Sequence, residues 1–460
     1  MSKTFVLVDR ETPYLLPPSL EEWLPADHLA RFVVEIVEEL DISRIESSYS
    51  GGGSPAYHPR MLVSLLFYSY ATGTFSSRRI EAASHDSLAT RYICANQHPD
   101  HDTIASFRKR FLTELPGLFV QILCVAQQMG LLKLGNVSID GTKLHANASK
   151  HKALSWEHAA KLERQLEAEV ATLMQRAEQA EQSENAEQIN VPEELARRQN
   201  RLAAIRAAKL AIAERVRQRD EQQQAEYQQK LDKRANQERS SGRKPRGNPP
   251  KPPESGPKPN DQINLTDEQS RIMPLSGGGF EQSYNAQALV DVTTHLIVAQ
   301  HVTQASNDKE QIQWALDEIT ALPTQLGTVT AMLGDNGYLS EQNVTAIEAA
   351  AITPLIALGR QAHNLPLEQR LQQSSQPAEA PPGEEATAMT RMAYRLKTVE
   401  GSALYAKRKS TVEPVFGIIK HVLGFRQFLL RGYQAVIGEW ALVSMAWNLK
   451  RMKTLRMRMI

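Results

Sequence analysis

Residues 137–152 read VSIDGTKLHANASKHK and join a short apolar run to a strongly basic one. The apolar run predicts a β-strand that delivers Asp140 onto a Gly-Thr turn. The basic residues Lys143, His145 and Lys150 follow closely. A carboxylate at a strand end is often a metal ligand, and cations beside it indicate a polyanionic substrate. A solvated acid in an ordinary turn is the alternative, and this stretch alone does not decide between the two.

Strand and helix patterns return from Ile263 onward. SYNAQALVD (283–291) and HLIVAQHVT (295–303) predict paired strands around a short turn. A helix, DKEQIQWALDEITALP, and a buried strand that ends at Asp335 follow. A second helix, SEQNVTAIEAA, and a strand, AITPLIAL, come next. The last two predicted elements are the helices TVEPVFGIIKHVLGF and GEWALVSMAWNLKRMKTL. Together with the strand before Asp140, this order predicts a mixed α/β sheet that is interrupted once.

Two of the predicted strands therefore end in aspartate, at Asp140 and Asp335. Because neighbouring strands of a sheet end close together, these two acids could share a metal, and Glu413 is the best candidate for a third ligand. Carboxylate ligands suit Mg²⁺, or Mn²⁺ in its place, and two such ions assist phosphoryl transfer. The rival acids are Asp291, Asp308 and Glu439.

Basic residues gather around Glu413 and beyond it. Lys420 lies seven residues downstream on nearly the same helix face, and Arg408 and Lys409 lie upstream. Residues 391–460 contain fourteen Lys and Arg against three Asp and Glu. A segment this cationic attracts phosphate backbones, although a solvated basic face is the simpler alternative.

Residues 1–134 predict an all-helical region. The expected helices cover HLARFVVEIVEEL, RMLVSLLFYSYATG, SSRRIEAASH and the long segment HDTIASFRKRFLTELPGLFVQILCVAQQMG. Helix-turn-helix-like DNA reading is one interpretation, and a generic bundle with ordinary surface arginines is the other. The basic residues near these helix starts are Arg78, Arg79, Arg108, Lys109 and Arg110. His98 and His101 in QHPDHD have metal-like spacing, but a turn with a helix N-cap is favoured because the segment has no cysteine partner.

Residues 153–234 predict a helical hairpin, an antiparallel coiled coil with roughly heptad spacing of apolar residues. Its apolar positions either close within one chain or leave a face for a second protomer, and an inert spacer is the simplest alternative. Residues 235–262 are a basic, proline-rich linker that we expect to be extended or disordered.

The bulk composition excludes several classes. The 460-residue chain has a net charge of +1, no apolar run of membrane-spanning length and two cysteines, Cys94 and Cys124. This usage argues against a disulfide framework, and the N-terminus has no secretory signal pattern. We therefore expect a cytoplasmic protein with no membrane partner, associated with the nucleoid if DNA is its substrate.

Taken together, VSIDGTKLHANASK, NLTDEQSRIM, YNAQALVD, GDNGYLS and YAKRKSTVEPVFGIIKHVLGFRQFLLRG resemble the DDE transposases of bacterial insertion sequences, of the family numbered eleven-eighty-two. The resemblance covers nearly the whole chain. It implies an RNase H-like mixed-sheet catalytic domain whose triad is Asp140, Asp335 and Glu413, with two Mg²⁺ ions. It also implies double-stranded DNA as partner, both terminal inverted repeats and target, and a homodimer in the synaptic complex.

The related Tyr-Arg-Glu-Lys signature fits Tyr405, Arg408, Glu413 and Lys420 except at one interval. The segment from Arg408 to Glu413 is one residue too long. Either Lys409 replaces the arginine or the register contains a local bulge. Lys143 and His145 would follow the DNA backbone, although a structural histidine is an equal interpretation of His145.

The expected domains are the helical DNA-binding region at 1–134, the first catalytic strand at 135–152, the hairpin at 153–234, the linker at 235–262, the rest of the catalytic domain at 263–430 and a basic helix at 431–460. The predicted function is cleavage at element ends and joining to target DNA. A catalytically inactive or domesticated DNA-binding relative and a plain metal-dependent nuclease are the alternatives.

Overall fold

The computed structural model describes residues 19–49, 56–181, 191–244, 247–275, 277–359, 380–383 and 385–459. The chain folds into two compact units. The first combines Met1–Leu144 with Tyr284–Ile460, and the second is His145–Ser283. Within these ranges, none of the helices has the length and apolarity required to cross a bilayer.

The N-terminal part of the first unit is helical, as predicted. Its helices are α1 (Leu20–Trp23), α2 (Leu29–Glu38), α3 (Ser43–Ser47), α4 (Pro59–Ala71), α5 (Ser77–Asp86), α6 (Leu88–Ile93), α7 (His101–Arg110) and α8 (Leu115–Gln128). The prediction of one helix over residues 101–130 was wrong, because α7 ends at Arg110 and α8 begins at Leu115. Pro116 lies in the first turn of α8, where the missing N–H of proline costs no helical hydrogen bond.

A mixed sheet forms the centre of the first unit. Within this unit its strands are β1 (Leu134–His145), β5 (Phe280–Asp291), β6 (Ile297–Thr303), β7 (Gly327–Gly334) and β8 (Thr353–Ile356), and a sixth strand, β4 (Arg271–Pro274), pairs with the beginning of β5. The order is β5-β1-β7-β8 with β6 beside β5; β1, β7 and β8 are parallel, and β6 is antiparallel to β5. The predicted class, an RNase H-like α/β fold with a helical insertion behind a helical N-terminal region, is confirmed.

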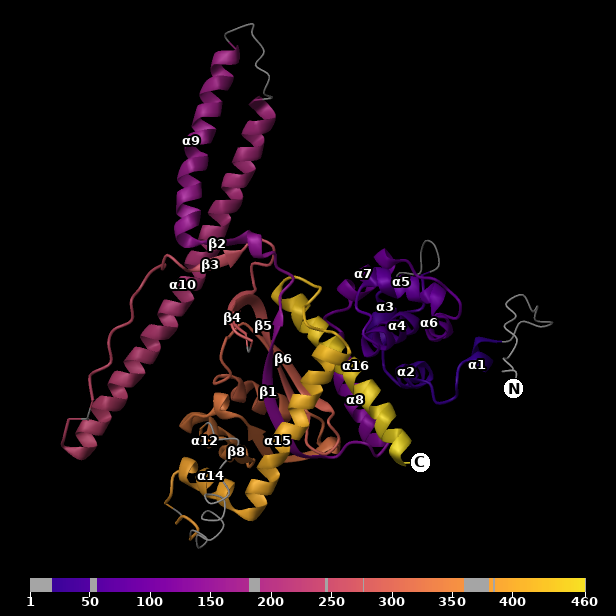
Figure 1. Cartoon of the computed structure of the whole chain (residues 1–460). Coiled ribbons are helices and arrows are strands. Elements are labelled where there is room, and N and C mark those ends of the chain that lie inside the picture. Colours follow the sequence, from indigo (N-terminus) through magenta and orange to yellow (C-terminus); the bar gives the residue numbers. More distant parts are fainter. Residues whose placement is uncertain are drawn as a thin grey trace, which may run out of the picture. The chain divides into compact units, whose positions relative to one another are not determined.

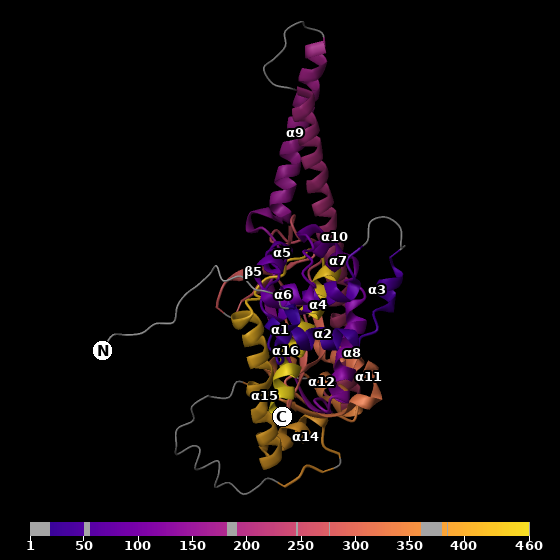
Figure 2. The ribbon, with the colours of Figure 1, turned by 90° about the vertical axis from the view of Figure 1, so that its right-hand side faces the viewer.

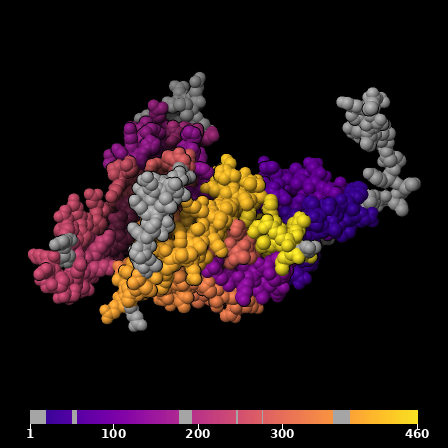
Figure 3. Space-filling view, turned by 60° about the horizontal axis from the view of Figure 1, so that its bottom comes forward, coloured from indigo at the N-terminus to yellow at the C-terminus, as the bar shows by residue number. Residues whose placement is uncertain are grey.

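Helices cover this sheet (Figure 1). They are α11 (Gln311–Ala321), α12 (Glu341–Ala349), α14 (Ala388–Lys397), α15 (Val399–Gly417) and α16 (Tyr433–Met459). Asn448 of α16 bonds both backbone groups of Ile297 in β6, each at 2.8 Å. The yellow end of α16 meets the N-terminal helices on one face (Figure 3), where Arg456 pairs with Glu35 at 2.7 Å.

The basic C-terminal helix is therefore largely a packing element. The middle of α16 is buried, from Val436 to Leu449 almost without interruption. Lys450 donates to the carbonyl of Ala71 at 3.1 Å, and Arg451 donates to that of Thr294 at 2.6 Å. These bonds commit part of the C-terminal positive charge to the fold.

The second unit consists of two long helices and short strands. α9 (Trp156–Glu181) and α10 (Val191–Ser241) run side by side (Figure 1, Figure 2). β2 (Ala153–Ser155) pairs with β3 (Gln262–Asn264), and β4 (Arg271–Pro274) pairs with residues 280–283 of β5. The helix interface buries the apolar residues Ala159, Leu166, Leu202, Ile205, Ala208, Ile212 and Val216.

Charged pairs line the α9–α10 interface. Arg206 bonds Glu163 at 3.2 Å and Glu167 at 2.6 Å. α10 runs on through residues 235–241, into the segment expected to be linker. The chain beyond it is held against the helix, because Arg219 binds Asp261 at 2.8 Å. The expectation of an extended or disordered linker was therefore wrong for residues 235–241, whereas the described residues from 242 to 261 form no helix or strand.

Candidate active site

The register between two parallel strands places Asp140 and Asp335 at the same level. Ser138 of β1 lies opposite Leu333 of β7. Asp140 and Asp335 each follow two residues later, so they extend from the same face of neighbouring strands. The predicted turn after Asp140 was wrong, because β1 continues through Gly141 to His145.

Local hydrogen bonds fix the two carboxylates. Asp140 Oδ1 accepts from its neighbour, the Gly141 N–H, at 2.8 Å. Asp335 caps the short 3₁₀ turn η3 (Asn336–Tyr338) by accepting from the Gly337 N–H, also at 2.8 Å. Each carboxylate is thereby oriented by the backbone of a small residue beside it.

Asp308, which the sequence offered only as a rival, lies beside this pair. Its Oδ1 accepts from Asn285 Nδ2 at 2.8 Å and from Gln287 Nε2 at 2.7 Å, both on β5. A Cβ atom on Gly141 would lie 2.6 Å from the same Oδ1 and 2.2 Å from the Gln287 amide nitrogen. Only glycine therefore allows β1 to approach this carboxylate so closely.

Asp335 and Asp308 both act electrostatically on Asp140. Burial and the negative charge of Asp335 raise the pKa of the Asp140 carboxyl to about 7. Asp308 adds to this rise, whereas the Gly141 N–H and Arg408 oppose it. Burial, followed by the charge of Asp308, also holds the pKa of Tyr338 well above its usual range. The site thus concentrates negative charge in a poorly solvated place.

Arg408 connects Asp140 to the third predicted acid. It is buried on α15, with Nη2 3.1 Å from Glu413 Oε1 and Nη1 4.0 Å from Asp140 Oδ2. Burial acts to lower the pKa of this guanidinium, but Tyr405 and the nearby carboxylates raise it overall. Lys409 is exposed. Arg408 is therefore placed beside Asp140 and Glu413.

Lys420 lies in the π-helical turn η4 (Ile418–Val422) that continues α15. Its Nζ donates to Thr142 Oγ1 at 2.8 Å and to the carbonyl of Lys143 at 3.2 Å. Burial lowers the pKa of Lys420, and Arg426 lowers it further. Because Thr142 lies two residues beyond Asp140 on the strand, this cation belongs to the same region.

The other two rival acids have structural partners. Asp291 accepts from the backbone N–H groups of Thr293 and Thr294 and so closes the β5–β6 turn. Glu439 is fully buried on α16 and accepts from the N–H groups of Leu429 and Leu430 at 2.9 and 3.0 Å. Neither arrangement brings these acids to Asp140.

The predicted DNA-contacting residues of the N-terminal helices differ in placement. Arg78, Arg79 and Lys109 are exposed. Arg110 is also exposed, and it donates to the Ser48 carbonyl at 2.5 Å. Arg108 is buried instead and donates to Tyr70 at 2.9 Å and to the Phe75 carbonyl at 3.0 Å. Its position is that of a packing residue.

Two further histidine predictions have clear positions. The QHPDHD segment forms the expected capped turn, with Asp100 as the cap that accepts from Thr103 N at 2.8 Å. His101 bonds Glu81 at 2.7 Å. His145, half-buried at the end of β1, belongs to the second unit. Across the described ranges, no three His, Cys, Asp or Glu side chains are grouped closely enough to hold a metal ion.

Two regions of the chain match known families. Residues 18–110 match the family described as Transposase domain (DUF772), and residues 257–449 match the Transposase DDE domain. The chain belongs, on both matches, to the DDE transposases of insertion sequences. No curated protein and no solved structure matches it.

Proposed function

We propose that this transposase binds the ends of an insertion sequence and carries out metal-dependent DNA cleavage and strand transfer, with Asp140, Asp335 and Glu413 as its catalytic carboxylates. The observation that carries this proposal is the shared level of Asp140 and Asp335 on parallel strands, with Arg408 between Asp140 and Glu413. Its substrate is the DNA of a bacterial nucleoid, in the cytoplasm.

The donor set suits a divalent cation. Two carboxylates at one level of the sheet repel each other, and the raised pKa of Asp140 records that repulsion together with burial. Oxygen donors of this kind are those that Mg²⁺ and Mn²⁺ prefer. Asp140 and Asp335 would hold two such ions together with Glu413, whose carboxylate pairs with Arg408 and would have to move toward the aspartates to join them. Ions held there would stabilise the attacking and leaving oxygens of phosphoryl transfer.

The surrounding residues supply positioning and positive charge. Arg408 orients Glu413 and offsets part of the charge of Asp140. Tyr405, half-buried on the same helix, supports Arg408 and packs on the sheet. Lys420 fixes β1 just beyond Asp140 and presents a cation to the phosphate next to the reacting bond, while Lys143, His145 and Lys409 follow the DNA backbone.

DNA recognition falls to the N-terminal helices in this proposal. The exposed residues Arg78, Arg79, Lys109 and Arg110 are available for backbone contact in a helix-turn-helix-like reader. Arg108 is assigned to packing because its bonds to Tyr70 and Phe75 occupy it. Two protomers would hold the two inverted repeats before joining them to target DNA.

The test is Mg²⁺-dependent nicking of a supercoiled plasmid that carries the element ends. Asp140→Ala, Asp335→Ala and Glu413→Ala should each lower the rate about a thousandfold or more, since a metal-stabilised transition state loses several kcal/mol. DNA binding and folding should remain. The exposed-face variant Asp102→Ala is the control. A triad variant that cleaves at the wild-type rate removes that residue from the proposal.

Two assays separate the alternatives. Wild-type protein that binds element ends but never nicks them is a catalytically inactive relative. Protein that nicks but never joins a pre-cut end to target DNA is a plain nuclease. The proposed function requires both products, and both must be absent when the metal is chelated.

A further inference from the structure

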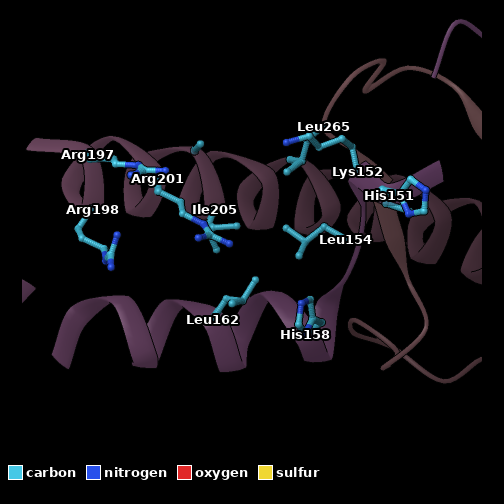
Figure 4. A pocket seen from close by; sticks show the side chains of 12 residues that line it. His151, Lys152, Leu154, His158, Leu162, Arg197, Arg198, Arg201, Ile205 and Leu265 are labelled. Atoms are coloured by element: carbon cyan, nitrogen blue, oxygen red, sulfur yellow. The ribbon is translucent and has the colours of Figure 1, made fainter. Parts of the chain in front are cut away.

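A cavity of about 590 Å³ lies within the second unit, between the first turns of α9 and the facing part of α10. Figure 4 shows the side chains that line it. Half of the lining residues are basic and half are apolar, and none is acidic. The basic ones are His151, Lys152, His158, Arg197, Arg198 and Arg201.

The arginines come from one face of α10. Arg197 and Arg201 are one helical turn apart at one end of the cavity, and His158 lies on α9 near Leu154 at the other end (Figure 4). Lys152 comes from the short turn η1 (Lys150–Lys152) that precedes β2. Three separate elements of the chain therefore direct positive charge into one hollow.

Part of this charge has no ion-pair partner within the protein. Arg198 is paired to Glu169 at 2.5 Å and to Glu194 at 2.6 Å, and Arg197 lies 3.8 Å from Glu194. Among the described residues, by contrast, no ion pair involves Lys152 or Arg201. Both side chains are exposed, so an anion in solution can reach them.

The rest of the lining is apolar. Leu154 and Ile205 are buried and belong to the core between the two helices. Leu265 remains 38% exposed at the edge of the cavity. A simple anion would contact only the basic side chains. A ligand that carries an anionic group next to a less polar group would contact both the basic and the apolar side chains.

We propose that this cavity binds the phosphodiester backbone of double-stranded DNA, with one phosphate at Arg201, another phosphate of the same strand at Lys152 and a sugar against Leu265, which lies near Lys152 (Figure 4). The assignment rests on the proposed function, since it is DNA that a transposase handles, and it adds a DNA contact in the insertion. Charge complementarity and the apolar wall favour a nucleic-acid backbone over an acidic peptide.

The first experiment measures binding of the full-length protein to duplex DNA in EDTA, which prevents cleavage, across a range of salt concentrations. The double variant Lys152→Ala/Arg201→Ala should bind about ten- to a hundredfold more weakly at low salt, and its salt slope should fall by about 2. The control Lys230→Ala/Arg239→Ala removes the same two charges from exposed positions of α10 outside the cavity and should keep the wild-type slope.

A second variant separates the apolar contact from the charge. Leu265→Ser should weaken DNA binding severalfold while the salt slope stays unchanged, because it removes no cation. Equal affinity and slope for wild type and the double variant would overturn the proposal. So would intact DNA binding by a double variant that no longer binds a polyglutamate peptide bound by wild type, which would assign the cavity to acidic protein segments.

The binding experiments can be distinguished from a test of DNA cleavage. A wild type whose salt slope depends on the cavity but that never cuts DNA in Mg²⁺ would refute the proposed function and leave this contact standing. A wild type that cuts DNA while the double variant binds normally would refute the contact alone. Failure of the wild type to bind duplex DNA would refute both.

Discussion

At the residue scale, Asp140 carries an electrostatic cost in the folded protein. Its pKa of about 7 lies above the value of an unfolded aspartate, about 3.9. Between these two pH values, the folded state binds more protons than the unfolded state at this group. By linkage, the free energy of unfolding therefore falls as pH rises through this window, and the full cost is present above pH 7.

Asp140→Asn should accordingly stabilise the metal-free protein at pH 8. We expect its Tm to exceed that of wild type by a few degrees there, because each kcal/mol moves Tm by about 2–4 °C in a large domain. The difference should vanish near pH 4, and Mg²⁺ should raise the Tm of wild type more than that of the variant. Thermal unfolding at the two pH values, with exposed Asp102→Asn as control, measures this. A lower Tm for Asp140→Asn at pH 8 contradicts the argument.

Asp308 gives a second prediction at this scale. Because its negative charge helps to raise the pKa of Asp140, Asp308→Asn should lower that pKa. The acid limb of the cleavage rate against pH should then move to lower pH. Asp317→Asn, an exposed change on α11, is the control and should leave the profile in place. An unmoved acid limb for Asp308→Asn would show that the two carboxylates are not coupled.

Sequence reasoning was weakest for individual side chains. Arg108 looks like a surface cation beside Lys109, yet it packs inside the helical region. Asp308 follows no strand, and its position depends on Asn285 and Gln287, more than twenty residues upstream. Neither placement has a local signal, because burial of a charged group is set by partners that are distant in sequence.

At the element scale, α15 and its continuation join the acids to the basic residues. Pro414 lies inside α15 and removes one backbone donor, and the π-helical turn that holds Lys420 follows. The i+7 spacing from Glu413 to Lys420 predicts that both side chains lie on nearly the same face of a regular α-helix. The π turn changes that geometry and lets Lys420 reach Thr142 on β1.

Lys420→Ala should therefore lower the rate of cleavage more than it lowers DNA affinity. The loss removes both the hold on β1 and one phosphate contact beside the reacting bond, and the salt slope should fall by about 1. Lys407→Ala removes the same charge from an exposed position of α15 to which no DNA contact is assigned, and it serves as the control. If the cleavage rate and the salt slope are both unchanged in Lys420→Ala, this lysine contributes neither to cleavage nor to DNA binding.

The sequence predicted the positions of the strands better than the positions at which helices begin and end. The apolar runs before Asp140 and Asp335 were enough to predict adjacent strands, because a buried parallel strand reads as a continuous apolar stretch. The turn after Asp140 was mispredicted since Gly141 usually marks a turn, whereas here it lets β1 pass Asp308. The cavity of the second unit had no signature, because residues 151–158 and 197–205 become neighbours only after the two helices pair.

At the scale of the whole molecule, residues 145–283 form a compact unit within a chain that resumes its sheet afterwards. The pairing of Ser155 in β2 with Gln262 in β3 brings together the two ends of the segment that contains α9 and α10. Removing residues 156–261 and joining these two residues through Asn-Gly would turn β2 and β3 into a two-residue hairpin, for which Asn-Gly is a favoured turn. The design keeps the strand pairing and deletes α9, α10 and the cavity wall.

We expect this deletion variant to bind a single element end through the N-terminal helices, with a smaller salt slope than wild type. It should fail to form complexes that hold two ends, because the basic cavity between the two helices is proposed to contact DNA. Gel-shift assays with one and two labelled ends, with strand transfer as the second readout, measure this. The matched control replaces residues 182–190, which join the helices, with a Gly-Ser loop of equal length and should keep paired complexes. Normal pairing and transposition by the deletion variant would make the insertion an inert spacer.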